Sequence, residues 1–451
     1  MFTVFFGSLI GIIAIVAGAV LYNYALEESR KRTRQKLLAR LDNAEALVQN
    51  GMLDDALKIY GEVSRSATGS GRGMLFPDIY ALCRYGEGQC FRKKAGGAPE
   101  FSSSAIQSYE EFLRHLPSAG IGIGEELKRG ETYYHLGLLY LACITKLQVR
   151  DRTAYLKRAE SLLASALTFV DLFAQEAGAP PGDAARVRAS IHQALGDIHF
   201  ELAETEHRRG AEQSLMKAIE AYDEASRIYT PGPYPVEHAA IVKAKALSFK
   251  KLFSLSDDIQ FMKCAVDMSK ELVAHREAAG SADEHFASLQ ELADYSTSMA
   301  LYLADADDNE QNRTLRQELL KDATACYERI LQLSHEDKVL IFSNDRAAVY
   351  QKLGSVKMRL FELEPAEALL EEGITLNRKA LEYVSEGSVE FATIQAAIGD
   401  LYLQLSRRRS RKDDVAKAKA AYAAAIKIFD VMGLTSYKQT VELSLKSIDC
   451  W

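Results

Sequence analysis

The sequence predicts an all-α solenoid of about eight helix pairs with elongated helices, preceded by one N-terminal transmembrane helix. Over most of the 451 residues, apolar side chains recur at i, i+3, i+4 and i+7, the spacing of one face of an α-helix. No run of alternating β-branched residues between Asn-Gly or Asp-Gly turns indicates a sheet. The nine prolines are few, and most stand between the predicted helices, as helix-rich architecture requires.

The chain begins with a long apolar stretch, which we expect to be a transmembrane anchor over residues 1–26. No charged side chain occurs there, and the run from Phe2 to Tyr22 matches the ~20 residues that cross a hydrocarbon core. A basic juxtamembrane linker over residues 27–36 follows, and its excess of Lys and Arg predicts that the repeats lie in the cytoplasm. The alternative is a cleaved signal peptide with its site at Ala17–Ala19, which places the repeats on the periplasmic or secreted side.

Within the predicted anchor, small residues form one stripe of a helix face: Gly7, Gly11, Ala14 and Gly18. Gly7 and Gly11 have the small-x-x-x-small spacing at which membrane helices pack closely. These four residues are therefore candidates for membrane-helix packing and for a homo-oligomer formed through the anchor. The alternative is that Gly and Ala are simply common in spanning helices.

The clearest repeat unit lies in residues 130–166. Its first segment carries Gly137 among large apolar residues, and its second segment carries Ala159 and Leu163 at helical spacing. Gly137 and Ala159 are small enough for two helices to approach closely, while the large residues fill the adjacent holes. This unit resembles the tetratricopeptide repeat (TPR), in which a W-x-x-L-G-x-x-Y segment is followed by an A-x-x-x-F-x-x-A segment.

A helix pair of this kind cannot bury its own apolar face, so the resemblance implies a stack of pairs over residues 37–435. Six clear copies share the spacing of the small and the large residue in their second helix. These residues are Ala56 and Tyr60, Ala105 and Tyr109, Ala159 and Leu163, Ala218 and Tyr222, Ala366 and Leu370, and Ala418 and Tyr422. Two degenerate copies, residues 237–275 and 283–333, keep a helical pattern, and the second of them retains Ala323 and Tyr327 at this spacing.

The copies differ in length. The small residues of the two helices stand closest in the first and fifth copies, at Ala44/Ala56 and Gly354/Ala366. In the other four copies the separation is longer by at least about seven residues, which is two turns of α-helix. We therefore expect elongated antiparallel helices in these copies and not disordered loops.

In TPR proteins, the first helices of successive repeats line a concave groove that takes up peptides or partner helices. The resemblance implies groove positions in this sequence, and the candidates are Glu45, Glu87, Tyr134, Gln193, Asp197, Phe200 and Asp400. The Lys and Asn that form the carboxylate clamp of TPR co-chaperones are missing, which disfavours an import or chaperone-docking receptor. Acidic candidates predominate, so the predicted groove attracts basic amphipathic segments. The competing interpretation is that acidic residues are frequent on any solvated helix.

Composition and motifs disfavour several other functions. A formal charge of −7 argues against nucleic acid as a partner, because phosphate binding needs a basic face. The six cysteines are scattered without a C-x-x-C motif, as buried thiols in a reducing compartment are, and no metal or cofactor is expected. The glycine-rich stretches 69–73 and 120–124 lack the G-K-[ST] ending of a P-loop. We find no catalytic constellation and expect that the protein is not an enzyme.

The C-terminal part of the chain contains two further features. Residues 407–412 form a basic turn, which is an exposed charged turn by default and a contact for an acidic partner or a membrane surface as the alternative. Residues 436–451 form a more polar helix, suited to cap the last pair of the solenoid.

Together these features predict a membrane-anchored TPR scaffold that mediates protein–protein interactions at the cytoplasmic face of a membrane. The alternative function is an envelope or secretion accessory factor with its repeats on the non-cytoplasmic side. In both cases the expected partners are proteins, bound by a rigid groove in which a few buried contacts supply most of the affinity.

Overall fold

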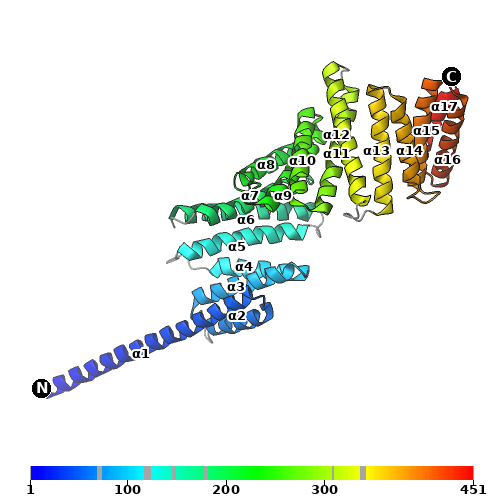
Figure 1. The fold of residues 1–451 in the computed structure, drawn as a ribbon. Coiled ribbons are helices and arrows are strands. Elements are labelled where there is room, and N and C mark those ends of the chain that lie inside the picture. The colour runs from blue at the N-terminus through cyan, green and yellow to red at the C-terminus, as the bar shows by residue number, and fades with distance from the viewer. Residues whose placement is uncertain are drawn as a thin grey trace. The chain divides into compact units, whose positions relative to one another are not determined.

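The computed structural model describes residues 2–68, 74–115, 123–144, 149–176, 181–306, 309–335 and 342–449. Over these residues it contains seventeen α-helices, one short 3-10 helix and no β-strand, which confirms the all-α prediction. The glycine-rich residues 69–73 and 120–122 lie outside the described part. The chain divides into two compact units, unit 1 (residues 1–207) and unit 2 (residues 208–451), and Figure 1 shows the helices of each.

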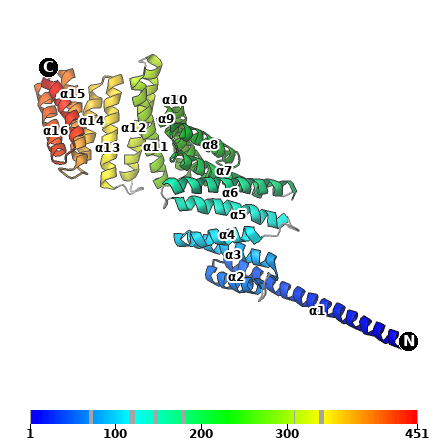
Figure 2. The ribbon, with the colours of Figure 1, turned by 180° about the vertical axis from the view of Figure 1, so that it is seen from behind.

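Unit 1 is a row of helices in which each helix contacts the one before it and the one after it, as Figure 1 and Figure 2 show. Its helices are α1 (Phe2–Gln49), α2 (Leu53–Thr68), α3 (Pro77–Ala95), α4 (Ser102–His115), α5 (Ile123–Cys143), α6 (Val149–Glu176) and α7 (Pro181–Ala203). A 3-10 helix, Pro99–Phe101, lies between α3 and α4. Sequential contacts of this kind are what a stack of helix pairs requires.

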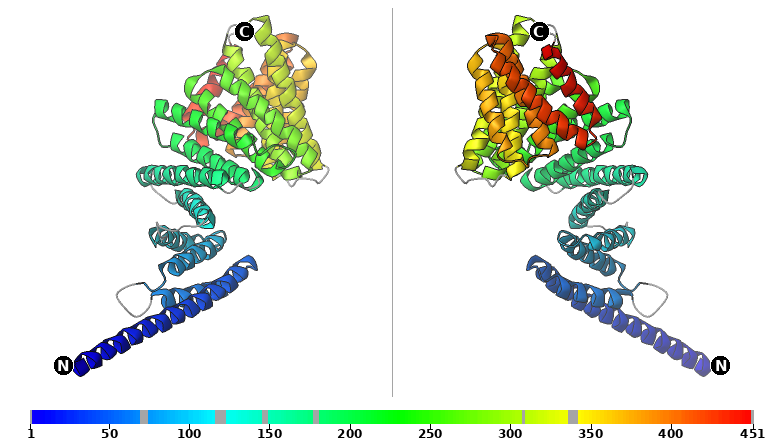
Figure 3. Two further views of the ribbon diagram at one scale, coloured as in Figure 1. Left: turned by 90° about the vertical axis from the view of Figure 1, so that its left-hand side faces the viewer. Right: turned by 90° about the vertical axis from the view of Figure 1, so that its right-hand side faces the viewer.

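Unit 2 has the same organisation, and Figure 3 shows its helices side by side in two views. Its helices are α8 (Arg208–Ser226), α9 (Pro235–Ser256), α10 (Ile259–Ala279), α11 (Ala282–Asp305), α12 (Glu310–His335), α13 (Ser343–Leu363), α14 (Glu367–Leu381), α15 (Val389–Arg409), α16 (Lys412–Val431) and α17 (Thr435–Asp449). The two degenerate copies are therefore helix pairs, α9–α10 and α11–α12. The fourth predicted copy is divided between the units, with α7 in unit 1 and α8 in unit 2.

The second-helix positions of the repeat pattern form the interior of both units. Their small and large side chains are at most 4% exposed: Ala56, Tyr60, Ala105, Tyr109, Ala159, Leu163, Ala218, Tyr222, Ala323, Tyr327, Leu370, Ala418 and Tyr422. Apart from Ala366 of the fifth copy, which is exposed, these positions are buried, so the tandem pattern in the sequence corresponds to a tandem packing arrangement.

The helices of a pair approach most closely at the predicted glycines. A Cβ atom on Gly137 would lie 2.6 Å from Cδ2 of Leu163, and a Cβ atom on Gly399 would lie 2.5 Å from the ring of Tyr422. Both distances are far below van der Waals contact. Glycine at these positions is therefore what allows α5 to pack on α6 and α15 to pack on α16 at their present separation.

Buried tyrosines of second helices donate hydrogen bonds to carboxylates of first helices. Oη of Tyr327 on α12 donates to Oδ1 of Asp294 on α11 at 2.6 Å, and Oη of Tyr422 on α16 donates to Oδ1 of Asp400 on α15 at 2.6 Å. Burial, followed by the adjacent carboxylate, raises the pKa of both phenols. These bonds give each buried hydroxyl the partner that an apolar interior would not provide.

In the third and sixth copies, the second helices show the expected elongation. α6 and α16 have 28 and 20 residues, against 16 in α2 and 15 in α14. The first helices do not, because α5 and α15 have 21 residues and α13 of the short fifth copy also has 21. The second copy differs, because its extra residues lie in the turn from Gly96 to Phe101, and α4 has only 14 residues. Gly96 and Gly97 are poor helix formers, and Pro99 cannot continue the hydrogen bonding of α3.

In the fifth copy, the position predicted for the small residue of the second helix is wrong. Ala366 is the exposed N-cap residue of α14, which begins only at Glu367, after Pro365. Gly373 makes the close approach instead, since a Cβ atom on Gly354 would lie 3.1 Å from its carbonyl oxygen. The short turn between α13 and α14 leaves no room for a further helical turn before Glu367.

The N-terminal helix α1 is continuous over 48 residues, so residues 27–36, predicted as a basic linker, lie within it (Figure 3). The side chains of residues 1–19 lie outside the described part of the structure, and with them the candidate packing residues of the anchor, Gly7, Gly11, Ala14 and Gly18. Where side chains are described, no helix combines the length and the apolar character that a membrane crossing requires.

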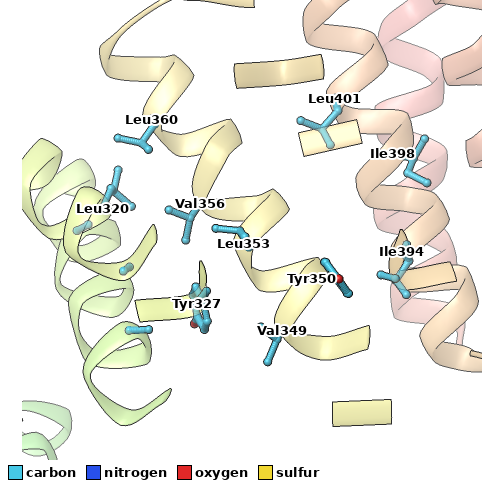
Figure 4. Packing of buried hydrophobic residues seen from close by; sticks show 14 of the residues in the cluster. Leu320, Tyr327, Val349, Tyr350, Leu353, Val356, Leu360, Ile394, Ile398 and Leu401 are labelled. Atoms are coloured by element: carbon cyan, nitrogen blue, oxygen red, sulfur yellow. The ribbon is translucent and has the colours of Figure 1, made fainter. Parts of the chain in front are cut away.

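The core of unit 2 is continuous from α9 to α17. Figure 4 shows part of it, with Leu320 and Tyr327 of α12 on one side of α13 and Ile394 and Ile398 of α15 on the other. At its C-terminal end, α17 covers the residues predicted to form a polar capping helix and packs on α16. α13 packs between α12 and α14, and this makes it a rigid base. The part of α13 that these two helices do not cover is open to a ligand.

Candidate functional site

A cleft of about 840 Å³ lies in unit 2, where α12 and α14 flank α13. The three helices line it with Glu328, Leu331, Gln332, His335, Tyr350, Leu353, Lys357, Ala368, Glu371, Glu372, Thr375, Leu376 and Lys379. α13, a first helix, lies between the second helices α12 and α14. It therefore forms the floor of the cleft, and α12 and α14 form its walls. We refer to this site as the α12–α14 cleft.

The centre of the α12–α14 cleft is apolar. Leu331 and Leu353 are only 8% and 2% exposed, and Leu376 is half-buried beside them. Leu353 stands directly before Gly354 in the repeat pattern, so the packing that brings α13 close to α14 also sets the depth of the cleft. Buried leucines at the base of an open cleft are surfaces on which an apolar side chain of a partner can anchor.

Lys357 connects the two walls across the floor. Its Nζ lies 3.0 Å from Oε2 of Glu372 on α14 and 3.5 Å from Oε1 of Glu328 on α12. The lysine side chain is 13% exposed, whereas both carboxylates are more than half exposed. One cation thus holds two glutamates at the rim, which keeps their remaining oxygens accessible to a second cation.

Two further carboxylates of α14 are held by an arginine of α15. Nε of Arg409 donates to Oε2 of Glu367 at 2.7 Å, and Nη2 donates to Oε1 of Glu371 at 2.6 Å. The hydrogen bonds to Glu371 and Glu367 raise the pKa of the Arg409 guanidinium. Of the predicted basic turn, Arg409 is therefore engaged within unit 2, while Arg408 and Lys412 are exposed.

The opposite end of the cleft is aromatic and basic. The rings of Tyr350 and Tyr383 stack with centroids 5.9 Å apart, and burial raises the pKa of Tyr350. Nζ of Lys379 lies 5.9 Å from the Tyr350 centroid, and the guanidinium of Arg346 lies 5.4 Å from the Tyr383 centroid. Cation–π contacts of this kind fix the cations over the rings, and Nη2 of Arg346 also donates to Oγ of Ser334 on α12.

The groove candidates predicted from the TPR resemblance lie on first helices of both units. Glu45 on α1 is exposed, whereas Tyr134 on α5 is half-buried. The remaining candidates on α7, which are also half-buried, are Gln193, Asp197 and Phe200. These residues do not line the α12–α14 cleft or the pocket described below. That they form a groove stays a prediction.

Glu87 on α3 is buried among polar groups of unit 1. Its Oε2 accepts a hydrogen bond from Nη1 of Arg84 at 2.6 Å, and Nε of the same arginine lies 2.8 Å from Glu111 on α4. Burial raises the pKa of the Glu87 carboxyl, and the nearby guanidinium of Arg84 acts in the opposite direction. Arg84 therefore joins α3 to α4 through Glu111, and Glu87 holds this arginine from within α3.

Asp400 lies at a second, smaller pocket. With Ala396, which the resemblance also places in the groove, it lines a pocket of about 300 Å³ between α15, α16 and α17. Burial raises the pKa of Asp400, and the hydrogen bond from Tyr422 opposes this rise. Among the groove candidates, Asp400 is the one that lines one of the two pockets discussed here. Oδ1 of its carboxylate accepts the hydrogen bond from Tyr422.

Sequence reasoning missed the α12–α14 cleft because the TPR resemblance directs attention to other helices. None of the groove candidates lies on α13, whose residues Tyr350, Leu353 and Lys357 line the cleft. The charge order of α14, with acidic residues in its first half and basic residues in its last turn, complements the dipole of any helix, so it gives no separate signal of the cleft.

The fold and the cleft together define an all-α protein of tandem helix pairs, with the small-and-large packing pattern of TPR-like repeats. Within the described residues, no group of three or more His, Cys, Asp and Glu side chains is placed to hold a metal ion. The charged groups of the cleft pair with one another across its walls, which suits recognition by shape and charge.

No known protein-family model matches this chain, and no curated protein matches it. Among solved structures, the chain is similar to the nuclear import adaptor Nro1 of S. pombe, with a TM-score of 0.39, 11% identity and coverage of 72% of this chain and 99% of that one. The apo form of RapI has a TM-score of 0.36 and 10% identity, covering 92% of this chain and 97% of that one. A tetratricopeptide repeat protein from Parabacteroides merdae has a TM-score of 0.33 and 13% identity, covering 81% and 98%. At these low scores and identities we infer nothing about function from the likeness.

Proposed function

We propose that the protein is a helical-repeat scaffold that binds protein partners, and that the α12–α14 cleft is a principal binding site. The observation that carries this proposal is the open cleft of about 840 Å³, with buried leucines at its base and charges of both signs at its rim. Clefts with an apolar base and a few placed polar groups are the usual sites of recognition. Binding, and not catalysis, is the activity proposed.

The rigidity of the site supports this role. α13 packs against α12 and α14, and Lys357, Arg409 and the glycine contact at Gly354 hold the walls in place. A preformed site avoids the entropy cost of ordering loops when a partner binds. The scaffold thus offers a surface whose shape is set before the encounter.

A bulky side chain in the cleft tests the proposal. Thr375→Trp places an indole inside the α12–α14 cleft, and Thr314→Trp is its matched control on α12, outside the cleft. Both threonines are exposed, and each hydroxyl donates to the carbonyl four residues earlier at 2.9 Å. We expect Thr375→Trp to lose the proteins that co-purify with the wild-type chain and Thr314→Trp to retain them, with equal helical circular dichroism. Retention of the same partners by both variants refutes the site.

We further propose that residues 1–26 anchor the protein in a membrane, with the repeats on the cytoplasmic side. The uncharged sequence supports this, as does the exposure of Val20, Leu21, Tyr22 and Tyr24, which are between 61% and 69% exposed on α1. The test is extraction of cell membranes with alkaline carbonate, together with a topology reporter fused after Trp451. Release of the full chain by carbonate, or a non-cytoplasmic reporter, contradicts the proposal.

The small-residue stripe of the anchor is proposed to pack two such helices together. The paired substitution Gly7→Ile and Gly11→Ile is expected to reduce self-association in a membrane reporter assay, because large side chains separate the backbones. Unchanged self-association overturns the homo-oligomer.

A further inference from the structure

The walls of the α12–α14 cleft share one direction of charge. α14 carries Glu367, Glu371 and Glu372 in its first half and ends in Arg378 and Lys379. α12 supplies Glu328 at the same end as these carboxylates, and it supplies His335, in its last turn, at the same end as Lys379. The cleft is therefore acidic at one end and basic at the other.

The acidic end keeps an excess of negative charge after its internal pairs are counted. Lys357 is shared by Glu328 and Glu372, and Arg409 is shared by Glu367 and Glu371. Two cations thus serve four carboxylates, all of which are at least 40% exposed. Cations of a partner complete these pairs without displacing any internal one.

The basic end has the reverse character. Lys379 is exposed over the ring of Tyr350, and Arg346 lies over the ring of Tyr383. Nη2 of Arg346 donates to Oγ of Ser334, and Arg346 is not part of the cleft lining. Lys379, which lines the cleft, is therefore the cation that meets acceptors of a partner at this end. Carboxylates of a partner are the matching groups at this end.

The α12–α14 cleft has the length of a short helix. From Ala368 to Lys379, α14 rises by about 16 Å, or three helical turns. Leu331, Leu353 and Leu376, one from each helix, line the middle of the cleft about one turn from the contacts of Lys357 with Glu328 and Glu372. Tyr350 lines the cleft about one further turn along α13. An amphipathic helix with apolar residues at i and i+3 or i+4 places its anchors one turn apart.

We infer that the occupant of the α12–α14 cleft is an amphipathic helix of a partner protein that has basic residues in its N-terminal half and acidic residues in its C-terminal half. It lies parallel to α14, with its N-terminus at the acidic end, where its helix dipole is also favourable. This inference rests on the proposed function and assigns the chemical class and the direction of the partner.

Two synthetic peptides of identical composition test the polarity. Both carry a hydrocarbon staple and leucines at the anchor spacing; one has Lys in its first half and Glu in its second, and the other has the reverse order. Glu-first order is the better order for an isolated helix, so a preference for the Lys-first peptide does not come from intrinsic helicity. We expect the full chain to bind the Lys-first peptide roughly threefold to tenfold more tightly in a fluorescence anisotropy titration.

A charge reversal in the protein tests the direction. Lys379→Glu is expected to weaken binding of the Lys-first peptide and to reduce the preference between the two peptides. Lys427→Glu makes the same change at an exposed lysine near the end of α16, outside the cleft, and is expected to leave both affinities unchanged. Equal binding of the two peptides, or equal effects of the two reversals, overturns the inference. Binding of the Lys-first peptide to Thr375→Trp as tightly as to the wild-type chain also overturns it.

Other outcomes separate this inference from the proposed function. If neither peptide binds while Thr375→Trp still loses the natural partners, the polarised helix is wrong and the scaffold stands. If Thr375→Trp retains every partner, the proposed site itself fails. If the chain self-associates with a concentration dependence that Thr375→Trp removes, the occupant is a second copy of this chain and the partner helix is excluded.

Discussion

The glycine contact between α5 and α6 gives a quantitative test of the repeat packing. In Gly137→Ala the new Cβ meets Cγ and Cδ2 of Leu163 at 2.7 and 2.6 Å, and Leu163 is fully buried. Overpacking of this kind costs about 1–3 kcal/mol. Contacts as short as 2.6 Å place this substitution in the upper part of that range, about 2–3 kcal/mol. The better helix propensity of alanine offsets about 1 kcal/mol, which leaves a net loss of about 1–2 kcal/mol in local stability.

Hydrogen–deuterium exchange of the full chain, resolved by peptide, measures this effect where it arises. Amides of α5 and α6 should exchange roughly fivefold to thirtyfold faster, while those of α15 and α16 in unit 2 serve as the internal reference. The matched control is Gly61→Ala on α2, in the same unit, where a Cβ atom meets nothing within 4 Å. This control should slow exchange slightly because alanine favours the helix. Unchanged or slower exchange in α5 and α6 of Gly137→Ala would show that the helices are not in the contact described.

Three further predictions follow from polar groups. Tyr422→Phe removes the hydroxyl that donates to Asp400 and leaves a half-buried carboxylate without this partner. We expect unit 2 to lose about 1–3 kcal/mol of unfolding free energy in urea denaturation. An unchanged urea midpoint contradicts this. Ser388→Ala should cost about 1 kcal/mol, since the Ser388 side chain accepts from the Phe391 amide at the start of α15, whereas Ser281→Ala, at a cap without such a bond, should cost much less. Burial, assisted by Arg92, lowers the pKa of His135 to about 3. His135 thus contributes stability that is complete above its unfolded value of 6.5 and declines as the pH falls toward 3, by about 1.4 kcal/mol per pH unit. His135→Phe should flatten the profile of unfolding free energy against pH in that window, and identical profiles refute the assignment.

Much of the fold follows from the sequence because it depends on local spacing. A small residue followed four positions later by a large one is buried when a neighbouring helix covers that face, as at Ala105 and Tyr109 and at Ala418 and Tyr422. The helical spacing of apolar residues alone predicts the helix pairs of the two degenerate copies. Turn chemistry was less predictable: Gly96, Gly97 and Pro99 put the extra residues of the second copy into a turn.

The site was less predictable than the fold. The face of α13 that lines the cleft contains Tyr350, Leu353 and Lys357, residue types that serve equally well in a core, and only the contacts of Lys357 with two walls distinguish it. Likewise, the sequence shows that Asp400 is acidic, but its bond with Tyr422 depends on the packing of α16 against α15. Local pattern specifies which helices form, and three-dimensional neighbours decide which side chains remain available to a ligand.

The buried phenols have a spectroscopic consequence. Burial raises the pKa of tyrosines in both units: Tyr60, Tyr85 and Tyr109 in unit 1, and Tyr295, Tyr327 and Tyr422 in unit 2. The value for Tyr109 is about 12. At about pH 10, where an unperturbed phenol ionises, these rings stay un-ionised while their unit is folded and become phenolate when it unfolds. The ultraviolet absorbance of phenolate therefore records the opening of each half of the chain without any added label.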